Sequence, residues 1–260
     1  MIYSKKIQHS SSNDWVVFVH GAGGSSAIWY KQIKTFSNLY NVLLVDLRGH
    51  GKSVDHGKRS DYSFEEISKD VIDVLDMHGI KNVHFVGVSM GCIIIKQICS
   101  IRPDLVKSMI FAGAVTKLNI KSRLLLRLGR LLKGIMPRMA LYGLFARIML
   151  PRKNHKESRK LFIQEARKLM ISEFNRWFRL TSRLTNYLNI LDRDQYHVPQ
   201  LYIMGRQDHL FLKPILELTK ENRFSELCIV EDCGHIVNVE RPDEFNERSI
   251  EFISRLNGFK

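Results

Sequence analysis

The 260-residue sequence predicts an α/β fold with a doubly wound, mostly parallel sheet and one inserted all-helical segment. Two observations carry this prediction. Short and nearly uninterrupted apolar runs, typical of parallel strands covered on both faces, alternate with segments of helical periodicity. One long segment has helical periodicity alone and a charge balance unlike that of the remaining chain. A chain of this length can bury one large core without a second domain.

Six runs rich in β-branched and aromatic residues are the predicted strands: 15–19 (WVVFV), 41–45 (NVLLV), 83–88 (VHFVGV), 108–113 (SMIFAG), 201–205 (LYIMG) and 227–230 (LCIV). Helices are expected between them. Ser63 and Glu66 form a capping box and Gly79 ends the helix that follows. A second helix is expected from Cys92 to Ile101, and two more contain first-turn prolines, Pro214 and Pro242.

The inserted segment is strongly basic. It is expected to form a helical cap over 116–194, between the two parts of the core, 1–115 and 195–260. Residues 117–183 contain 18 basic and only 3 acidic side chains, a net charge of +15, although the whole chain carries +14. Its longest uncharged run has 8 residues, far fewer than the roughly 20 that span a bilayer. The cap therefore holds the entire excess of positive charge.

This charge predicts an anionic partner, either an acidic substrate or an anionic membrane that carries a lipid ester. Arginines alternate with leucine clusters in RLLLRLGRLLKGIM, which suits a helix at an interface. The alternative is a solvated face on a lid whose leucines pack on the core. A nucleic-acid partner is not favoured, because no recognisable nucleic-acid motif accompanies the charge.

Several classes of site find no support in the sequence. The four cysteines have no metal-ligand or CxxC spacing, and no dinucleotide fingerprint is present, so neither a metal nor another cofactor is expected. The N-terminal residues lack the apolar stretch of an export signal. We therefore expect a cytoplasmic protein with reduced thiols, with peripheral membrane contact as the alternative location.

The stretch GVSMG, residues 87–91, joins a predicted strand directly to a predicted helix. It matches the G-x-S-x-G nucleophile elbow, in which a strained turn pushes the serine outward. Glycines flank Ser89 because side chains at those positions would clash with neighbouring elements. The alternative is a serine that caps the helix beside small residues needed for packing.

Four motifs in order resemble those of the α/β-hydrolase superfamily: HGAGG at 20–24, DLRGHGKS at 46–53, GVSMG at 87–91, and CGH at 233–235. The stretch 198–208, ending in Asp208, resembles the strand and turn that carry the family's acid. The resemblance covers the chain outside the basic segment. It implies a serine hydrolase that acts through a Ser-His-Asp triad and needs no cofactor.

Ser89, Asp208 and His235 follow the chain order Ser, Asp, His expected of this fold, so we predict them as nucleophile, acid and base. Asp232 competes as the acid but lies only three residues before His235. By position, the backbone N–H groups of Met90 and Ala22 form the oxyanion hole, with Gly23 as the alternative to Ala22. Each donor is expected to stabilise the transition state by about 3 kcal/mol.

The predicted reaction is hydrolysis of an ester or related acyl bond, in a small molecule or a lipid, through an acyl-enzyme. Carbon–carbon bond hydrolysis or a lyase reaction could use the same triad. A different class remains open, because a member of this fold can serve as a ligand-binding or signalling protein.

Overall fold

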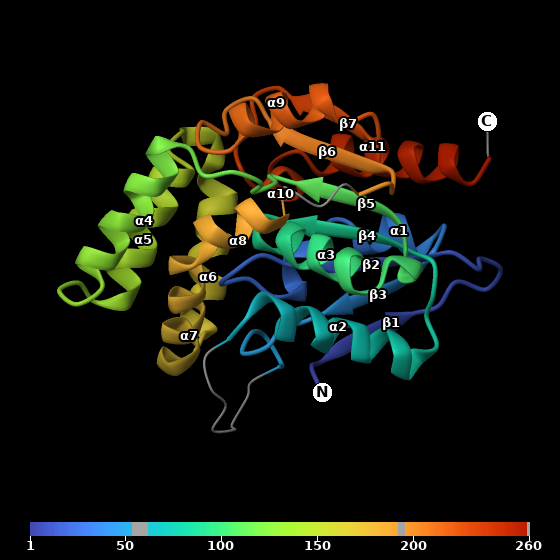
Figure 1. The fold of residues 1–260 in the computed structure, drawn as a ribbon, viewed down its shortest axis with the longest axis horizontal. Helices are drawn as coiled ribbons and strands as arrows, with labels where there is room; N and C mark the ends of the chain where they lie inside the picture. Colours follow the sequence, from blue (N-terminus) through green and yellow to red (C-terminus); the bar gives the residue numbers. More distant parts are fainter. Residues whose placement is uncertain (54–61, 192–195, 259–260) are drawn as a thin grey trace.

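The computed structural model describes residues 1–53, 62–191 and 196–258. In this part of the chain, a seven-stranded sheet has the order β1-β3-β2-β4-β5-β6-β7 (Figure 1). Only β1 runs antiparallel to its neighbour. The strands are β1 (Ser4–Ile7), β2 (Trp15–Val19), β3 (Asn41–Val45), β4 (Val83–Val88), β5 (Val106–Ala112), β6 (Gln200–Gly205) and β7 (Ser225–Val230). The predicted mostly parallel sheet is confirmed.

All six predicted strands are present, and among the strands of the described residues only β1 was not predicted. This edge strand has four residues, SKKI, of which both lysines are exposed. A run so short and so polar carries no apolar signal. Central strand β4 shows the opposite pattern, because all six of its residues are buried.

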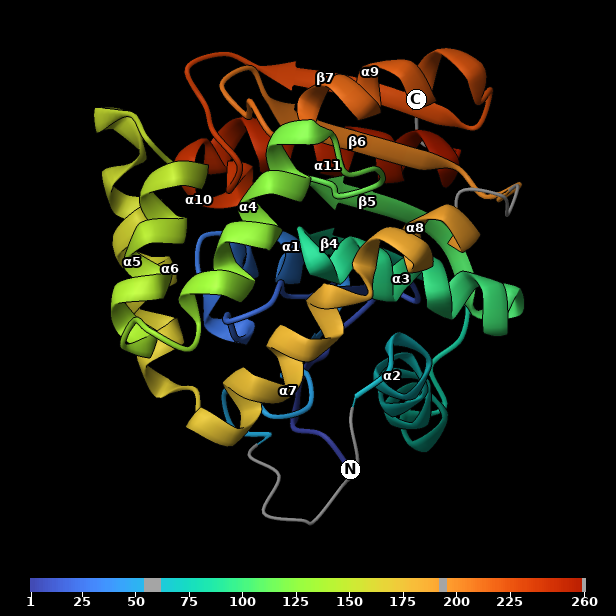
Figure 2. The same cartoon turned by 60° about the vertical axis from the view of Figure 1, so that its left-hand side comes forward.

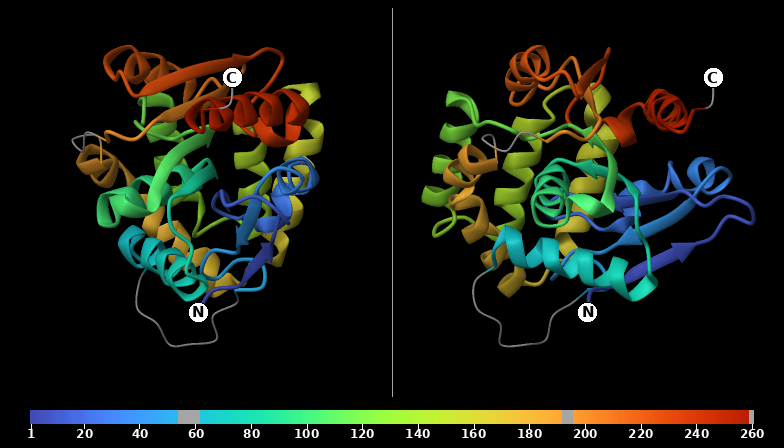
Figure 3. Two further views of the ribbon diagram at one scale, coloured as in Figure 1. Left: turned by 90° about the vertical axis from the view of Figure 1, so that its right-hand side faces the viewer. Right: turned by 45° about the vertical axis from the view of Figure 1, so that its right-hand side comes forward.

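Helices cover both faces of the sheet (Figure 3). One apolar core packs against α2 (Phe64–His78) and α3 (Met90–Ile101). The second core packs against α1 (Ile33–Ser37) and α11 (Pro242–Leu256) on the other face. The capping box at Ser63 and the left-handed Gly79 that ends α2 are both confirmed. The remaining core helices are α9 (Leu212–Glu221), α10 (Val237–Glu240) and the 3₁₀ turns η1 (Ser26–Trp29) and η2 (Pro103–Leu105).

Between β5 and β6 the described chain is helical, and these helices lie together beyond the carboxyl ends of the strands (Figures 1 and 2). They are α4 (Ile120–Leu132), α5 (Arg138–Met149), the 3₁₀ turn η3 (Lys153–His155), α6 (Lys156–Lys168), α7 (Ile171–Ser182) and α8 (Leu184–Leu191). The expected boundary between residues 194 and 195 lies outside the described residues.

The three acidic side chains of residues 117–183 all bond to the core of the protein. Glu157 accepts hydrogen bonds from Tyr30 and Lys31, and Glu165 accepts one from the Ser25 hydroxyl at 2.6 Å. Glu173, fully buried, accepts from the Tyr62 hydroxyl and pairs with Arg176. These three carboxylates therefore attach the cap to the core.

Candidate active site

Ser89 occupies a strained turn between β4 and α3. Its backbone has φ +53° and ψ −114°, a conformation that a residue with a side chain rarely adopts. A Cβ on Gly87 would lie 2.5 Å from Ile95 Cδ1, and one on Gly91 would lie 2.3 Å from the Val19 carbonyl oxygen. The predicted need for flanking glycines is confirmed. The Ser89 side chain makes no capping hydrogen bond to α3, so its hydroxyl does not serve as a helix cap.

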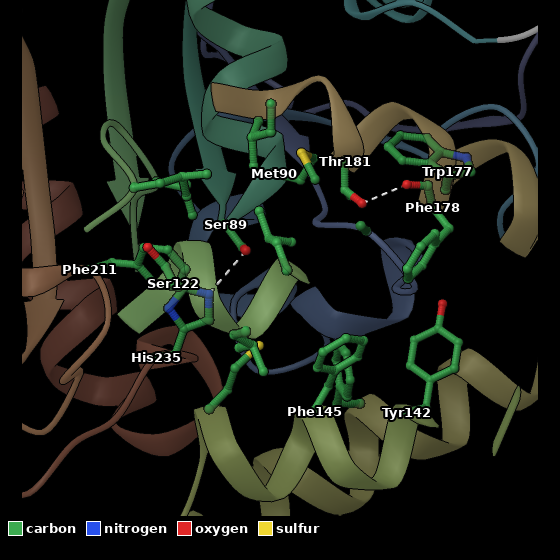
Figure 4. Close-up of a pocket in the computed structure, with 18 of the residues that line it drawn as sticks. Ser89, Met90, Ser122, Tyr142, Phe145, Trp177, Phe178, Thr181, Phe211 and His235 are labelled. Carbon is green, nitrogen blue, oxygen red and sulfur yellow. Dashed lines mark hydrogen bonds between the residues drawn. The ribbon is translucent and has the colours of Figure 1, made fainter. Parts of the chain in front are cut away.

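The structure brings Ser89, His235 and Asp208 together, although they lie far apart in the sequence. His235 Nε2 is 3.0 Å from Ser89 Oγ, as Figure 4 shows, and His235 Nδ1 is 2.8 Å from Asp208 Oδ2. The second carboxylate oxygen, Oδ1, accepts from the backbone N–H groups of Leu210 and Phe211 at 3.3 and 3.1 Å. Because both Asp208 oxygens accept, the imidazole donates through Nδ1 and leaves Nε2 to accept from the serine hydroxyl.

Asp232, the rival acid, points elsewhere. It is exposed, has φ +47°, and its Oδ1 accepts from the Gln207 side-chain amide at 3.2 Å. The structure therefore places Asp208, and not Asp232, against the histidine.

His20 and His50 join the two glycine-rich loops that precede the elbow. His20 Nε2 accepts from the Leu47 N–H, and His50 Nε2 accepts from the Gly23 N–H, both at 2.9 Å. Each Nδ1 lies within hydrogen-bonding distance of a backbone carbonyl. Burial lowers the pKa of His20 and lowers that of His50 to about 3. Both rings are therefore uncharged at neutral pH, and each holds the two loops together through its hydrogen bonds.

The loop that follows β2 lies against the elbow. A Cβ on Gly21 would be 3.2 Å from Ser89 Cβ and 3.7 Å from the Met90 nitrogen, and Ala22 lines the same cavity as Ser89. The Gly23 N–H already donates to His50. This arrangement favours Ala22 over Gly23 as the second donor beside the Met90 N–H.

A carboxylate that the sequence did not single out as functional supports the loop that carries His235. Glu240 Oε2 accepts from the Gly234 N–H at 2.7 Å, and Oε1 accepts from the Ile236 N–H at 3.4 Å. Oε1 also accepts from the Ser158 hydroxyl of α6 at 3.0 Å. This side chain therefore connects the histidine loop to the cap. Its partner Ser158 lies 82 residues away, a pairing that no local pattern reveals.

A cavity of about 190 Å³ opens in front of Ser89 and His235. Figure 4 shows Tyr142 and Phe145 reaching toward it from α5, and Trp177 and Phe178 from α7. Its lining residues are Ala22, Ser89, Met90, Val115, Leu118, Ser122, Leu125, Leu126, Tyr142, Phe145, Met149, Phe162, Phe174, Trp177, Phe178, Thr181, Leu184, Phe211 and His235. Among these described residues there is no carboxylate, ammonium or guanidinium group, so the cavity favours an apolar ligand.

Comparison with known proteins agrees with this architecture. Residues 14–140 match the family model described as the alpha/beta hydrolase fold. The chain is an α/β-hydrolase-fold protein. Over 92% of its length it is 28% identical to 87% of a 2-hydroxy-6-oxononadienedioate/2-hydroxy-6-oxononatrienedioate hydrolase of Klebsiella pneumoniae.

Two further similarities are more limited. The chain is 33% identical to an (E)-2-((N-methylformamido)methylene)succinate hydrolase of Acinetobacter baylyi over 102 residues, 39% of this chain and only 38% of that relative's length. A structure from Nitrososphaera gargenis, described in work on carboxylesterases, superposes with a TM-score of 0.78 at 20% identity and covers 98% of this chain and 95% of that one. The structural likeness shows the shared fold.

The described residues also bear on three other features: metal sites, membrane-spanning helices and thiols. Within them, no group of three or more His, Cys, Asp or Glu side chains could hold a metal ion. Nor does any helix in the described ranges have the length and apolar character to cross a bilayer. All four cysteines are free, and burial raises the pKa of the Cys92 thiol beside the elbow.

Proposed function

We propose that this protein is a serine hydrolase that cleaves an ester or related acyl bond of an apolar substrate through an acyl-enzyme on Ser89. The observation that supports this most strongly is the hydrogen-bonded chain from Ser89 through His235 to Asp208 at the mouth of an apolar cavity. A serine hydroxyl needs a base to take its proton, and that base needs an oriented acceptor. The site has both.

In the proposed reaction, His235 Nε2 removes the proton of Ser89 as Oγ bonds to the acyl carbon. The N–H groups of Met90 and Ala22 then stabilise the negative oxygen. The bond to the leaving group breaks, and His235 delivers the proton to it. His235 next takes a proton from a water molecule, whose oxygen attacks the acyl carbon. The proton passes to Ser89 Oγ as the acyl–serine bond breaks, which releases the acid and restores the serine. Asp208 holds the imidazole in the required tautomer throughout the reaction.

The cavity lining supports an apolar acyl group more than an acidic one. Burial of each methylene contributes about 0.8 kcal/mol, so kcat/KM should rise with chain length until the cavity is full. A charged acyl group would lose its hydration without gaining an ion pair, because no charged side chain lines the cavity in the described chain. The positive charge of the cap therefore does not act within this cavity.

Carbon–carbon bond hydrolysis is the second candidate, favoured by the similarity to the Klebsiella pneumoniae enzyme along most of both chains. The substrate in the name of that relative, a dioate, is a dicarboxylate. The uncharged lining described here offers no cation to pair with its carboxylates. This difference favours the ester over the dicarboxylate as substrate.

The test is an activity screen with nitrophenyl esters of increasing acyl length and with a 2-hydroxy-6-oxo dienoate, each run with Ser89→Ala as control. We expect ester turnover that grows with chain length and falls by several orders of magnitude in the variant. Turnover of the dienoate alone would replace the proposal with the second candidate. Absence of both activities in a folded protein would favour a binding protein.

A further inference from the structure

The outer face of α4 carries an exposed apolar stripe, defined here as Ile120, Leu124, Leu128, Leu131 and Ile135. These side chains are 84, 64, 37, 72 and 81% exposed. They recur every three or four residues, so they lie on one side of the helix and continue into the turn after it. Isolated exposed leucines are ordinary on a protein surface, but an aligned row of this kind marks an interaction site.

Cations flank this stripe. At 3.6 residues per turn, Lys121 lies on one side of it and Arg127 and Arg130 lie on the other, and all three are exposed. Residues 117–156 contain 11 basic side chains and no acidic one. The next three acidic residues along the chain, Glu157, Glu165 and Glu173, are bonded to the core, as described above. The outer face of α4 is therefore both apolar and cationic.

The inner face of the same helix belongs to the active-site cavity. Ser122, Leu125 and Leu126 line that cavity, and Gly129 lets the Phe145 ring of α5 approach closely. Figures 1 and 2 show α4 on the outside of the cap. One helix thus separates the apolar stripe from the cavity in front of Ser89.

We infer that the outer face of α4 docks on the anionic lipid surface of a bilayer. The apolar stripe would enter the boundary between headgroups and acyl chains while the flanking cations approach anionic headgroups. A second copy of this chain fits the surface less well, because a two-fold contact would place each cationic patch against itself. Docking itself requires no chemistry at Ser89. Only the further idea that the substrate comes from the lipid surface rests on the proposed function.

The experiment is cosedimentation with vesicles of phosphatidylcholine alone and of phosphatidylcholine mixed equally with phosphatidylserine, at low and high salt. We expect binding to the anionic vesicles, weakened by salt, and much weaker binding to the neutral ones. Each basic residue near the surface corresponds to about 5-fold in partitioning. The triple variant K121Q/R127Q/R130Q should therefore lose on the order of 100-fold, and the double variant L124S/L131S at least about 10-fold.

Two controls make the result specific. The variant K5Q/K6Q/K34Q removes the same number of charges from exposed positions of the core, on β1 and α1, and should bind like the unmodified protein. Ser89→Ala should also bind normally, which separates docking from hydrolysis. Three outcomes would overturn the inference: equal binding to both vesicle types or none, equal losses in the two triple-charge variants, or a dimer in solution that L124S/L131S dissociates.

Discussion

Replacement of Asp208 by asparagine removes one acceptor without changing the size of the side chain. Both carboxylate oxygens accept in the structure, one from His235 Nδ1 and the other from the N–H groups of Leu210 and Phe211. An amide has only one oxygen, so its NH₂ group must face a donor on one side. If the oxygen keeps the two backbone bonds, the NH₂ faces His235 and favours the tautomer with the proton on Nε2. That nitrogen can then no longer accept from Ser89.

The expected loss is up to about 10⁴-fold in kcat, which corresponds to about 5.5 kcal/mol of transition-state stabilisation. The assay is steady-state hydrolysis of a nitrophenyl ester, with thermal unfolding to verify that the variant is folded. Asp232→Asn is the matched control, because that exposed carboxylate accepts a hydrogen bond from the Gln207 side chain and does not face His235, and asparagine tolerates the positive φ of the position. We expect less than about a 2-fold change there. The reasoning would be refuted if Asp232→Asn lost more activity than Asp208→Asn.

Two more predictions concern the support of the site and the core. Glu240→Gln retains a single acceptor oxygen for the three donors, which come from Gly234, Ile236 and Ser158. Because the loop that carries His235 loses support, kcat should fall about 10-fold with little change in KM. An unchanged kcat would show that the histidine loop does not need the Glu240 carboxylate. Burial and the charge of Lys107 lower the pKa of His84 from 6.5 to about 4. Between these pH values the unfolded chain binds a proton that the folded chain does not, so stability is lost as the pH falls from 6.5 toward 4. His84→Leu should reduce the slope of unfolding free energy against pH by about 1.4 kcal/mol per unit, measured by urea denaturation, and an unchanged slope would contradict the assignment.

Much of the fold could be predicted because its signals are local. Buried parallel strands such as 83–88 appear in the sequence as nearly uninterrupted apolar runs. The capping residues Ser63 and Gly79 mark the start and the end of α2. The edge strand β1 could not be found this way, because three of its four residues are polar and its pairing with β3 is set by tertiary contact. Local pattern therefore identifies central strands better than edges.

In the site, too, the residues within local motifs could be predicted, and the roles that depend on distant partners could not. The motifs around Ser89, Asp208 and His235 identified side chains that the structure brings into hydrogen-bonding contact. His50 accepts from the Gly23 N–H, and Glu240 connects the histidine loop to Ser158 of the cap; these roles depend on partners 27 and 82 residues away. The uncharged cavity was also invisible in the composition, because the cationic side chains of α4 face outward while Leu125 and Leu126 of the same helix line the cavity. Net charge alone pointed as much to an acidic substrate as to a membrane.

The central claim is that Ser89 carries the acyl group. The most direct measurement is mass spectrometry of the protein quenched in acid during rapid reaction with a nitrophenyl ester, followed by peptide mapping. The account predicts a mass increase of one acyl group on the peptide that contains Ser89, formed together with a burst of nitrophenol and absent in Ser89→Ala. An acyl group on another residue, or ester turnover that survives in Ser89→Ala, would contradict it.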